Sequence, residues 1–210
     1  MSQIRTALAF DGQAAVKRLL DVGCSLGYVM EAAQRLGLRA AGSDVSSYAV
    51  KVCRDRGYRA EVGTLESLPF PPREFDLVMM KHVLEHTPTP QAALAEVKRV
   101  LSPGGLVMVL VPSLLYWKGL YRRRTYRYFR PDDLGMQHYV YHTPATLRLQ
   151  LERAGFEVLA MTKAVFRRVA VRGPFSWVRE ALRFGWVSFV QRALDVLHMQ
   201  HEVTAIARVR

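Results

Sequence analysis

A glycine-rich loop between a predicted strand and a predicted helix constrains the fold of this chain more than any other feature. The apolar run 18–22 leads directly into the segment 23–27 (GCSLG), and apolar residues at helical spacing begin at Tyr28. In open α/β sheets this position, at the carboxyl end of a strand, binds nucleotide-like ligands, and glycine lets the backbone approach them closely. The pattern predicts an α/β fold with a ligand site beside this loop.

Strand and helix patterns alternate along the chain in the manner of a doubly wound, mostly parallel sheet. With 18–22, the predicted strands number seven, the other six being 39–43, 58–62, 75–80, 105–111, 156–166 and 202–209. Helices are predicted at 28–36, 47–56, 90–101 and 143–154. No Gly/Ser/Pro-rich linker divides the sequence, so we expect one domain over 1–210, with its core at about 17–166 and 202–209.

The glycine spacing argues against binding of NAD or FAD. The dinucleotide fingerprint G-x-G-x-x-G, started at Gly23, requires glycine at the positions of Ser25 and Tyr28. Asp44 follows the second predicted strand, where a carboxylate can accept hydrogen bonds from both hydroxyls of a ribose. Asp44 also suits the N-cap of the next helix, so this residue alone leaves both interpretations open.

Six motifs in order resemble those of class I S-adenosylmethionine-dependent methyltransferases, most closely the small-molecule type 11 and type 23 groups. They are 20–27 (LDVGCSLG), 42–44 (GSD), 65–70 (LESLPF), 75–78 (FDLV), 82–86 (HVLEH) and 101–105 (LSPGG). The resemblance covers about residues 17–160, and the segment 143–156 is similar to the type 23 group. It implies a Rossmann-like class I methyltransferase fold and S-adenosylmethionine as the cofactor.

The resemblance also implies the residues that bind the cofactor. Its methionine part would be surrounded by Asp21, Gly23, Ser25 and Gly27. Asp44 would hold the ribose, Leu65 would contact the adenine, and Lys81 with His82 would lie beside the sulfonium. Two positions depart from the family pattern, because Ser25 replaces the middle glycine and Thr64 stands where an Asp commonly receives the adenine amino group.

The resemblance predicts methyl transfer to a small-molecule acceptor, or to one linked to a lipid or polysaccharide, with oxygen as the favoured acceptor atom. A general base assists when the acceptor is a hydroxyl, and histidine titrates near neutral pH. We expect His138 to be the catalytic base, because it precedes a segment that commonly borders the acceptor pocket in the family. His82 is the second candidate, and His142 is a further histidine nearby in sequence.

The segment 82–86 matches the H-x-x-E-H zinc motif, but no metal site is predicted. Two histidines at that spacing share one face only of a sustained helix, and Pro88 and Pro90 follow within four residues. Such a site also needs a third ligand. Glu85 and His86 are therefore expected to pack or form hydrogen bonds within the loop after the fourth strand.

A net charge of +12 predicts an anionic partner or acceptor. Basic and aromatic residues gather in a predicted lid insertion, 114–142, where arginines would suit a phosphate or carboxylate of the acceptor. RNA methylation is the alternative, because basic and aromatic residues also form nucleic-acid grooves. Nucleic acid is disfavoured, since the sequence shows no appended RNA-binding domain.

An amphipathic helical insertion is predicted at 175–199, with aromatic residues and arginines that suit an anionic membrane surface. The alternatives are packing on its own domain or in a homodimer. With only 16 residues before the first strand, we expect the lid to come from these two insertions. Neither a signal peptide nor a membrane span is predicted, so a cytoplasmic location is expected. Peripheral attachment to the inner face of the membrane is an alternative location. A non-catalytic, cofactor-binding scaffold at that surface is an alternative function.

Overall fold

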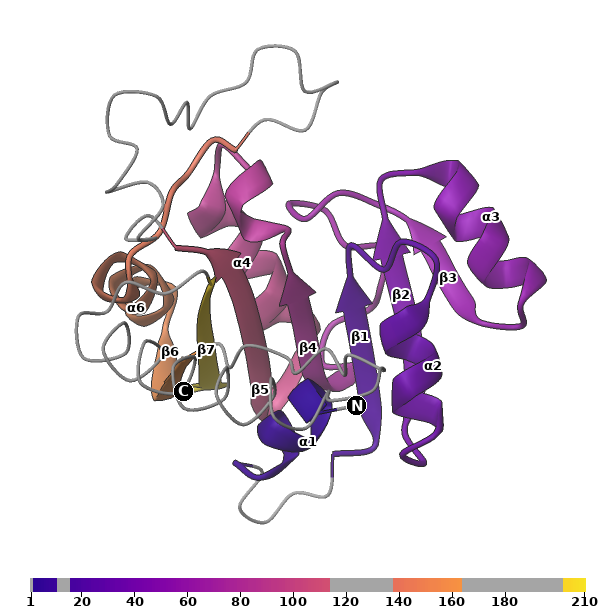
Figure 1. Ribbon diagram of the computed structural model, residues 1–210, viewed down its shortest axis with the longest axis horizontal. Coiled ribbons are helices and arrows are strands. Elements are labelled where there is room, and N and C mark those ends of the chain that lie inside the picture. The colour runs from indigo at the N-terminus through magenta and orange to yellow at the C-terminus, as the bar shows by residue number, and fades with distance from the viewer. Residues whose placement is uncertain (1, 11–15, 114–137, 164–201) are drawn as a thin grey trace, which may run out of the picture.

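The computed structural model describes residues 2–10, 16–113, 138–163 and 202–210. Within them, seven strands form one sheet in the order β3-β2-β1-β4-β5-β7-β6 (Figure 1). The strands are β1 (Arg18–Val22), β2 (Arg39–Asp44), β3 (Arg59–Val62), β4 (Phe75–Lys81), β5 (Leu101–Pro112), β6 (Phe156–Lys163) and β7 (Glu202–Val209). Strands β1 to β5 pair in parallel, whereas β7 runs antiparallel between β5 and β6. The predicted mostly parallel, seven-stranded sheet is confirmed.

Helices connect these strands. They are α1 (Ser2–Leu8), α2 (Tyr28–Gln34), α3 (Ser47–Asp55), the short 3₁₀ helix η1 (Leu84–His86), α4 (Pro90–Val100) and α6 (Pro144–Arg153). No helix in these described stretches is long and apolar enough to cross a membrane. Most of the predicted lid, 114–137, and all of the predicted helical insertion at 175–199 lie outside the described residues.

The two faces of the sheet bury alternate side chains of each central strand, as the two-residue period of a strand requires. Leu77 and Met79 of β4 belong to a core cluster that includes residues of α1 and α2. Their neighbours Val78 and Met80 belong to a second cluster that includes residues of α4 and α6. Helices therefore cover both faces, and the continuous apolar strands in the middle are explained by burial on each side.

Two elements differ from the sequence prediction. Helix α1 is not predicted at all, and it is held by Ile4 and Ala7, which are buried in the core. Strand β5 begins at Leu101 rather than at 105, because Leu101 pairs with Phe75 across an irregularity in the register, after which Leu106 pairs with Leu77. The Ser-Pro-Gly-Gly sequence at 102–105 thus lies inside the strand, whereas the prediction placed residues 102–104 in a turn before it.

The register brings the ends of three strands level. Val22 at the end of β1 pairs with Ser43 of β2 on one side and with Met80 of β4 on the other. The loops that follow these strands therefore meet at one edge of the sheet, which is where open parallel sheets bind ligands.

Candidate functional site

The loop after β1 folds onto the end of β2. The backbone N–H groups of Gly23 and Cys24 both donate to the carbonyl of Ser43, at 2.7 and 3.0 Å. Gly23, Ser25 and Gly27 all have positive φ, at 72°, 47° and 84°, and α2 begins directly after Gly27. A tight loop of this kind leaves backbone N–H groups at a helix start, where they can face a ligand.

Gly23 also governs the contact between the loops after β1 and β4. A Cβ atom at this position would stand 2.5 Å from Cγ2 of Val83, which follows β4. Only glycine permits both this approach and the left-handed backbone. The two loops therefore form one continuous wall at the edge of the sheet.

Asp44 links the glycine loop to the next helix. Its Oδ2 accepts a hydrogen bond from the N–H of Ser25 at 2.8 Å, and its Oδ1 accepts one from the N–H of Ser46 at 2.9 Å. The N-cap of α3 is Ser46, whose side chain accepts a hydrogen bond from the N–H of Ala49. Asp44 is thus not the cap, and its half-buried carboxylate retains lone pairs for further donors such as hydroxyls.

Asp21 supplies a second carboxylate, buried at the end of β1 and 3% exposed. Burial raises the pKa of Asp21 to about 8, with a further contribution from the negative charge of Asp44 and a partial opposing effect of Lys81. A cationic ligand group beside Asp21 would favour its ionised form. This carboxylate and Asp44 together suit a ligand that carries both a positive charge and hydroxyl groups.

The predicted adenine contact, Leu65, lies in the loop after β3. Its side chain is 7% exposed and packs in the core cluster on the α4 side of the sheet. Thr64 and Ser67 form an isolated bridge that closes a turn around it. Lys81 is exposed at the end of β4. In the order of the sheet, β4 lies on one side of β1 and β3 on the other, so Lys81 and Leu65 lie on opposite sides of the glycine loop that follows β1.

His82 begins the loop after β4 in a left-handed conformation, with φ of 55°. Its Nε2 lies 3.0 Å from Oε1 of Glu202 at the start of β7, and its Nδ1 lies 3.4 Å from Oε1 of Glu85. The hydrogen bond to Glu202 and then the nearby carboxylate of Glu85 raise the pKa of His82 to about 9, against the opposing effect of burial. An imidazole that is protonated at neutral pH cannot accept a proton, so this environment counts against His82 as a general base.

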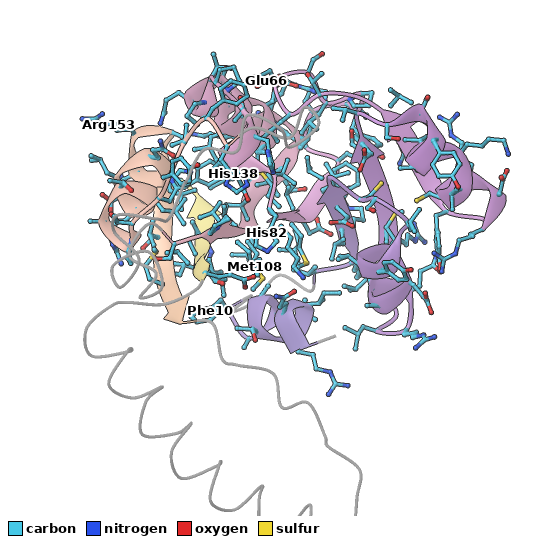
Figure 2. The ribbon with its side chains drawn as sticks, turned by 45° about the horizontal axis from the view of Figure 1, so that its top comes forward. Phe10, Glu66, His82, Met108, His138 and Arg153 are labelled. Carbon is cyan, nitrogen blue, oxygen red and sulfur yellow. The ribbon has the colours of Figure 1, made fainter. Side chains whose placement is uncertain are left out.

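His138 lies beside the same loop, and Figure 2 labels it together with His82. Its ring meets that of His86 edge to face, with the centroids 4.8 Å apart. The N–H groups of Tyr139 and Val140 donate to the carbonyl of Glu85, which holds this segment against η1. The neighbouring His142 is fully buried, and burial lowers its pKa although Glu85 acts in the opposite direction.

The structure brings both predicted catalytic histidines to the surroundings of Glu85. Sequence reasoning missed the contacts of Glu85, although the H-x-x-E-H match had drawn attention to it. It also missed Glu202, for which the sequence carries no local signal. Glu202 lies at the start of β7, which is separated from β4 by β5 alone in the sheet, and this order cannot be read from the residues around His82. The cofactor residues lie on the adjoining loops, and their roles stay predictions.

This sheet order, with one antiparallel strand beside β5 and a glycine loop after β1, defines the Rossmann-like fold of class I S-adenosylmethionine-dependent methyltransferases. A family model described as a methyltransferase domain matches residues 1–161, so the chain belongs to that family. The cofactor implied by family and fold is S-adenosylmethionine, and the carboxylates at Asp21 and Asp44 fit its ammonium and ribose groups chemically.

Two curated relatives match up to half of the chain. A ubiquinone biosynthesis O-methyltransferase of Thiobacillus denitrificans is 36% identical over 100 residues, which cover 44% of this chain and 43% of that protein. A demethylmenaquinone methyltransferase of Tropheryma whipplei is 32% identical over 109 residues, covering 50% and 46%. The match thus spans less than half the length of these two relatives.

Solved structures share the fold. An S-adenosylmethionine-dependent methyltransferase from Mesorhizobium loti superposes with a TM-score of 0.65 at 18% identity, covering 99% of this chain and 98% of that one. One from Thermotoga maritima gives a TM-score of 0.66 at 17% identity, covering 99% and 89%. At these identities the likeness concerns the fold alone.

Proposed function

We propose that this chain transfers a methyl group from S-adenosylmethionine to an oxygen atom of a small-molecule acceptor, free or linked to a lipid or polysaccharide. The observation that carries the proposal is the junction of Asp44 with the glycine loop, where one carboxylate binds the N–H groups of Ser25 and Ser46 beside the buried Asp21. The relatives named for ubiquinone and demethylmenaquinone support a small-molecule acceptor.

The proposed roles of the cofactor residues are those that the family resemblance implies. Gly23, Ser25 and Gly27 shape the backbone around the methionine part of the cofactor, and Asp21 faces its ammonium group. Asp44 receives the ribose hydroxyls, because its oxygens lie at the end of β2 and retain free lone pairs. Leu65 contacts the adenine from the loop after β3, and Lys81 stands beside the sulfonium.

Methyl transfer asks little covalent chemistry of the protein. The cofactor, when bound, supplies a methyl group already activated on a positively charged sulfur. The contribution of this chain is therefore to align the acceptor in line with that group and to keep water away from it. We assign this task to the wall formed by Gly23 and Val83 and to the segment that begins at His138, which is held against the loop after β4.

A base is needed if the acceptor hydroxyl must lose its proton, and His138 is the residue proposed for that step. His82 is the weaker candidate, since Glu202 and Glu85 favour its protonated form. Replacing His138 with Ala should lower turnover far more than cofactor affinity. Measuring the turnover number alongside the dissociation constant for S-adenosylmethionine checks this, and an equal loss of both would contradict the assignment.

Calorimetric titration tests the proposed cofactor site. The purified chain should bind S-adenosylmethionine and S-adenosylhomocysteine but not NAD, and Asp44→Ala should weaken both by at least about tenfold, because it removes the ribose acceptor and loosens the glycine loop. Asp55→Ala, at the exposed end of α3 in an ion pair with Lys51, is the matched control and should bind normally. Binding that survives Asp44→Ala would move the cofactor elsewhere.

The acceptor is proposed to be anionic because the chain carries a net charge of +12. Acceptor assays with radiolabelled cofactor should offer quinol precursors, lipid-linked phosphates and RNA in parallel. Label in RNA, with binding that falls steeply as salt rises, would instead favour nucleic-acid methylation. Cofactor binding without transfer to any acceptor class would favour the scaffold alternative.

A further inference from the structure

Glu85 is a buried carboxylate without an adequate partner in the described residues. It is 1% exposed, and neither of its carboxylate oxygens has a hydrogen-bond partner there. The nearest cationic group is His82, whose Nδ1 lies 3.4 Å from Oε1, which is long for a hydrogen bond. Burying a carboxylate in this way is costly, so a buried group left like this requires an explanation.

Two imidazole rings converge on the same carboxylate from different parts of the chain. The ligand atoms that Glu85, His86 and His138 offer all lie within 4.8 Å of one another. His86 ends η1, and His138 precedes the segment whose N–H groups at Tyr139 and Val140 bind the carbonyl of Glu85. Backbone hydrogen bonds therefore hold all three residues in one place independently of their side chains.

We propose that Glu85, His86 and His138 form a binding site for a divalent transition-metal ion, with Zn²⁺ as the best match. Two imidazole nitrogens and one carboxylate are a donor set that zinc and non-haem iron use in proteins. Two nitrogens bound tetrahedrally to one zinc ion stand about 3.3 Å apart. Small side-chain rotations would bring the three groups from their present separation to that distance.

The proposed site departs from the sequence-based expectation of no metal. That expectation depended on the long helix that His82 and His86 would need to share, and on the need for a third ligand. The structure has a three-residue 3₁₀ helix, η1, at this point, and the proposed ligand set does not use that pair. His138 takes the place of His82, and it comes from a segment remote in sequence that local spacing cannot reveal.

The neighbours of the site fit this assignment. His82 contacts Glu85 and Glu202, so it is positioned to orient the ligand carboxylate from the other side. Three protein donors leave at least one coordination position open. An acceptor oxygen could occupy this open position, and that extension rests on the proposed methyl transfer. The binding of the ion itself does not depend on the proposed methyl transfer. A nitrogen of His138 bound to the ion has no lone pair for a proton, so ion binding replaces its role as the base.

Metal titration of the full chain tests the site. After removal of metals with a chelator, the chain should bind one Zn²⁺ per molecule in competition with a chromophoric zinc probe. His138→Asn and His86→Asn should each weaken binding by at least tenfold. His198→Asn, a histidine outside the set, is the matched control and should leave it unchanged. Because His138 is only half-buried, its variant should keep the melting temperature of the metal-free chain.

Cobalt substitution gives a readout independent of activity. Co²⁺ bound by two imidazoles and a carboxylate should give visible absorption bands that both ligand variants abolish and His198→Asn preserves. Glu85→Gln should also abolish these bands, and circular dichroism should show that this variant is folded. Zinc binding that His86→Asn and His138→Asn leave intact, or no stoichiometric binding at all, would overturn the proposal. Failure of cofactor binding in the separate calorimetric experiment would not affect it.

Discussion

At the scale of single residues, position 23 requires both a positive φ and a close approach to Val83, and only glycine can satisfy both. Its φ of 72° costs an L-residue roughly 1–2 kcal/mol. The 2.5 Å approach of a Cβ atom to Val83 adds the cost of moving that side chain. Gly23→Ala should therefore lower the free energy of unfolding by about 2–4 kcal/mol, measured by urea denaturation.

Gly37→Ala separates these two contributions. Gly37 has a similar φ of 78°, but a Cβ atom there would meet nothing within 4 Å. We expect this control to cost only about 1–2 kcal/mol, from the backbone alone. In the double variant with Val83→Ala, the cost of Gly23→Ala should fall toward that of Gly37→Ala. Equal costs for the two single variants would show that the contact with Val83 does not matter.

At the scale of elements, Asp76 ties the start of β4 to the start of β1. It accepts hydrogen bonds from the backbone N–H groups of Lys17 and Arg18 at 3.1 and 3.0 Å, and it forms an ion pair with the guanidinium of Arg18 at 2.6 Å. Partial burial raises the pKa of Asp76, but these donors outweigh that effect and lower it below the ordinary value. The ionised form is thus the one that stabilises the sheet.

The pH dependence of Asp76→Asn follows from that direction. A carboxyl with a lowered pKa stabilises the fold fully above its unfolded pKa of about 3.9, and the contribution is lost as the pH falls through the native pKa. Because the pair is partly exposed to solvent, we expect the variant to cost about 1 kcal/mol near neutral pH. Urea titrations at several pH values should show this difference vanishing in acid. Asp55→Asn, in an exposed ion pair with Lys51, should show almost no difference at any pH.

The central strands β1, β4 and β5 could be predicted because each is a largely apolar run with buried side chains on both faces of the sheet. Helix α1 could not, since seven residues without a capping signal form a helix here only because Ile4 and Ala7 pack under the sheet. The predicted start of β5 was wrong because proline and glycine normally mark turns. Here an irregularity in the register with β4 accommodates them inside the strand.

The same distinction applies to the site. The glycine loop and Asp44 are contiguous with predicted elements, so their proximity follows from the parallel sheet. The meeting of His86 with His138, and of His82 with Glu202, depends on how remote segments cross the sheet edge. Local spacing contains no information on such contacts, and the sequence therefore pointed to individual histidines but not to their partners.

At the scale of the whole molecule, β7 is central although it comes last in the chain. It pairs with β5 on one side and β6 on the other, and residues 203–207 are all buried. Removing 202–210 should abolish cooperative unfolding in circular dichroism and calorimetry, because it exposes two strand edges and the core between them. Removing Arg210 alone, which is exposed, should leave the transition intact.

A point variant gives a milder test of the same strand. Ile206 is fully buried on the α1 side of the sheet, so Ile206→Ala should lower the free energy of unfolding by about 2–4 kcal/mol. The measurement is urea denaturation of both proteins at the same pH. An unchanged midpoint would show that β7 contributes little to the core.

The position of β7 also bears on how the chain folds during its synthesis. The strands that carry the glycine loop, Asp44 and His82 leave the ribosome first and can pair with their sequence neighbours at once. Strand β6, in contrast, pairs only with β7 in the part of the chain that the structure describes. It must wait for the residues of β7, and until then the edge of β5 that faces β7 stays unpaired. The nascent chain is thus exposed to aggregation for the time needed to translate the segment between β6 and β7.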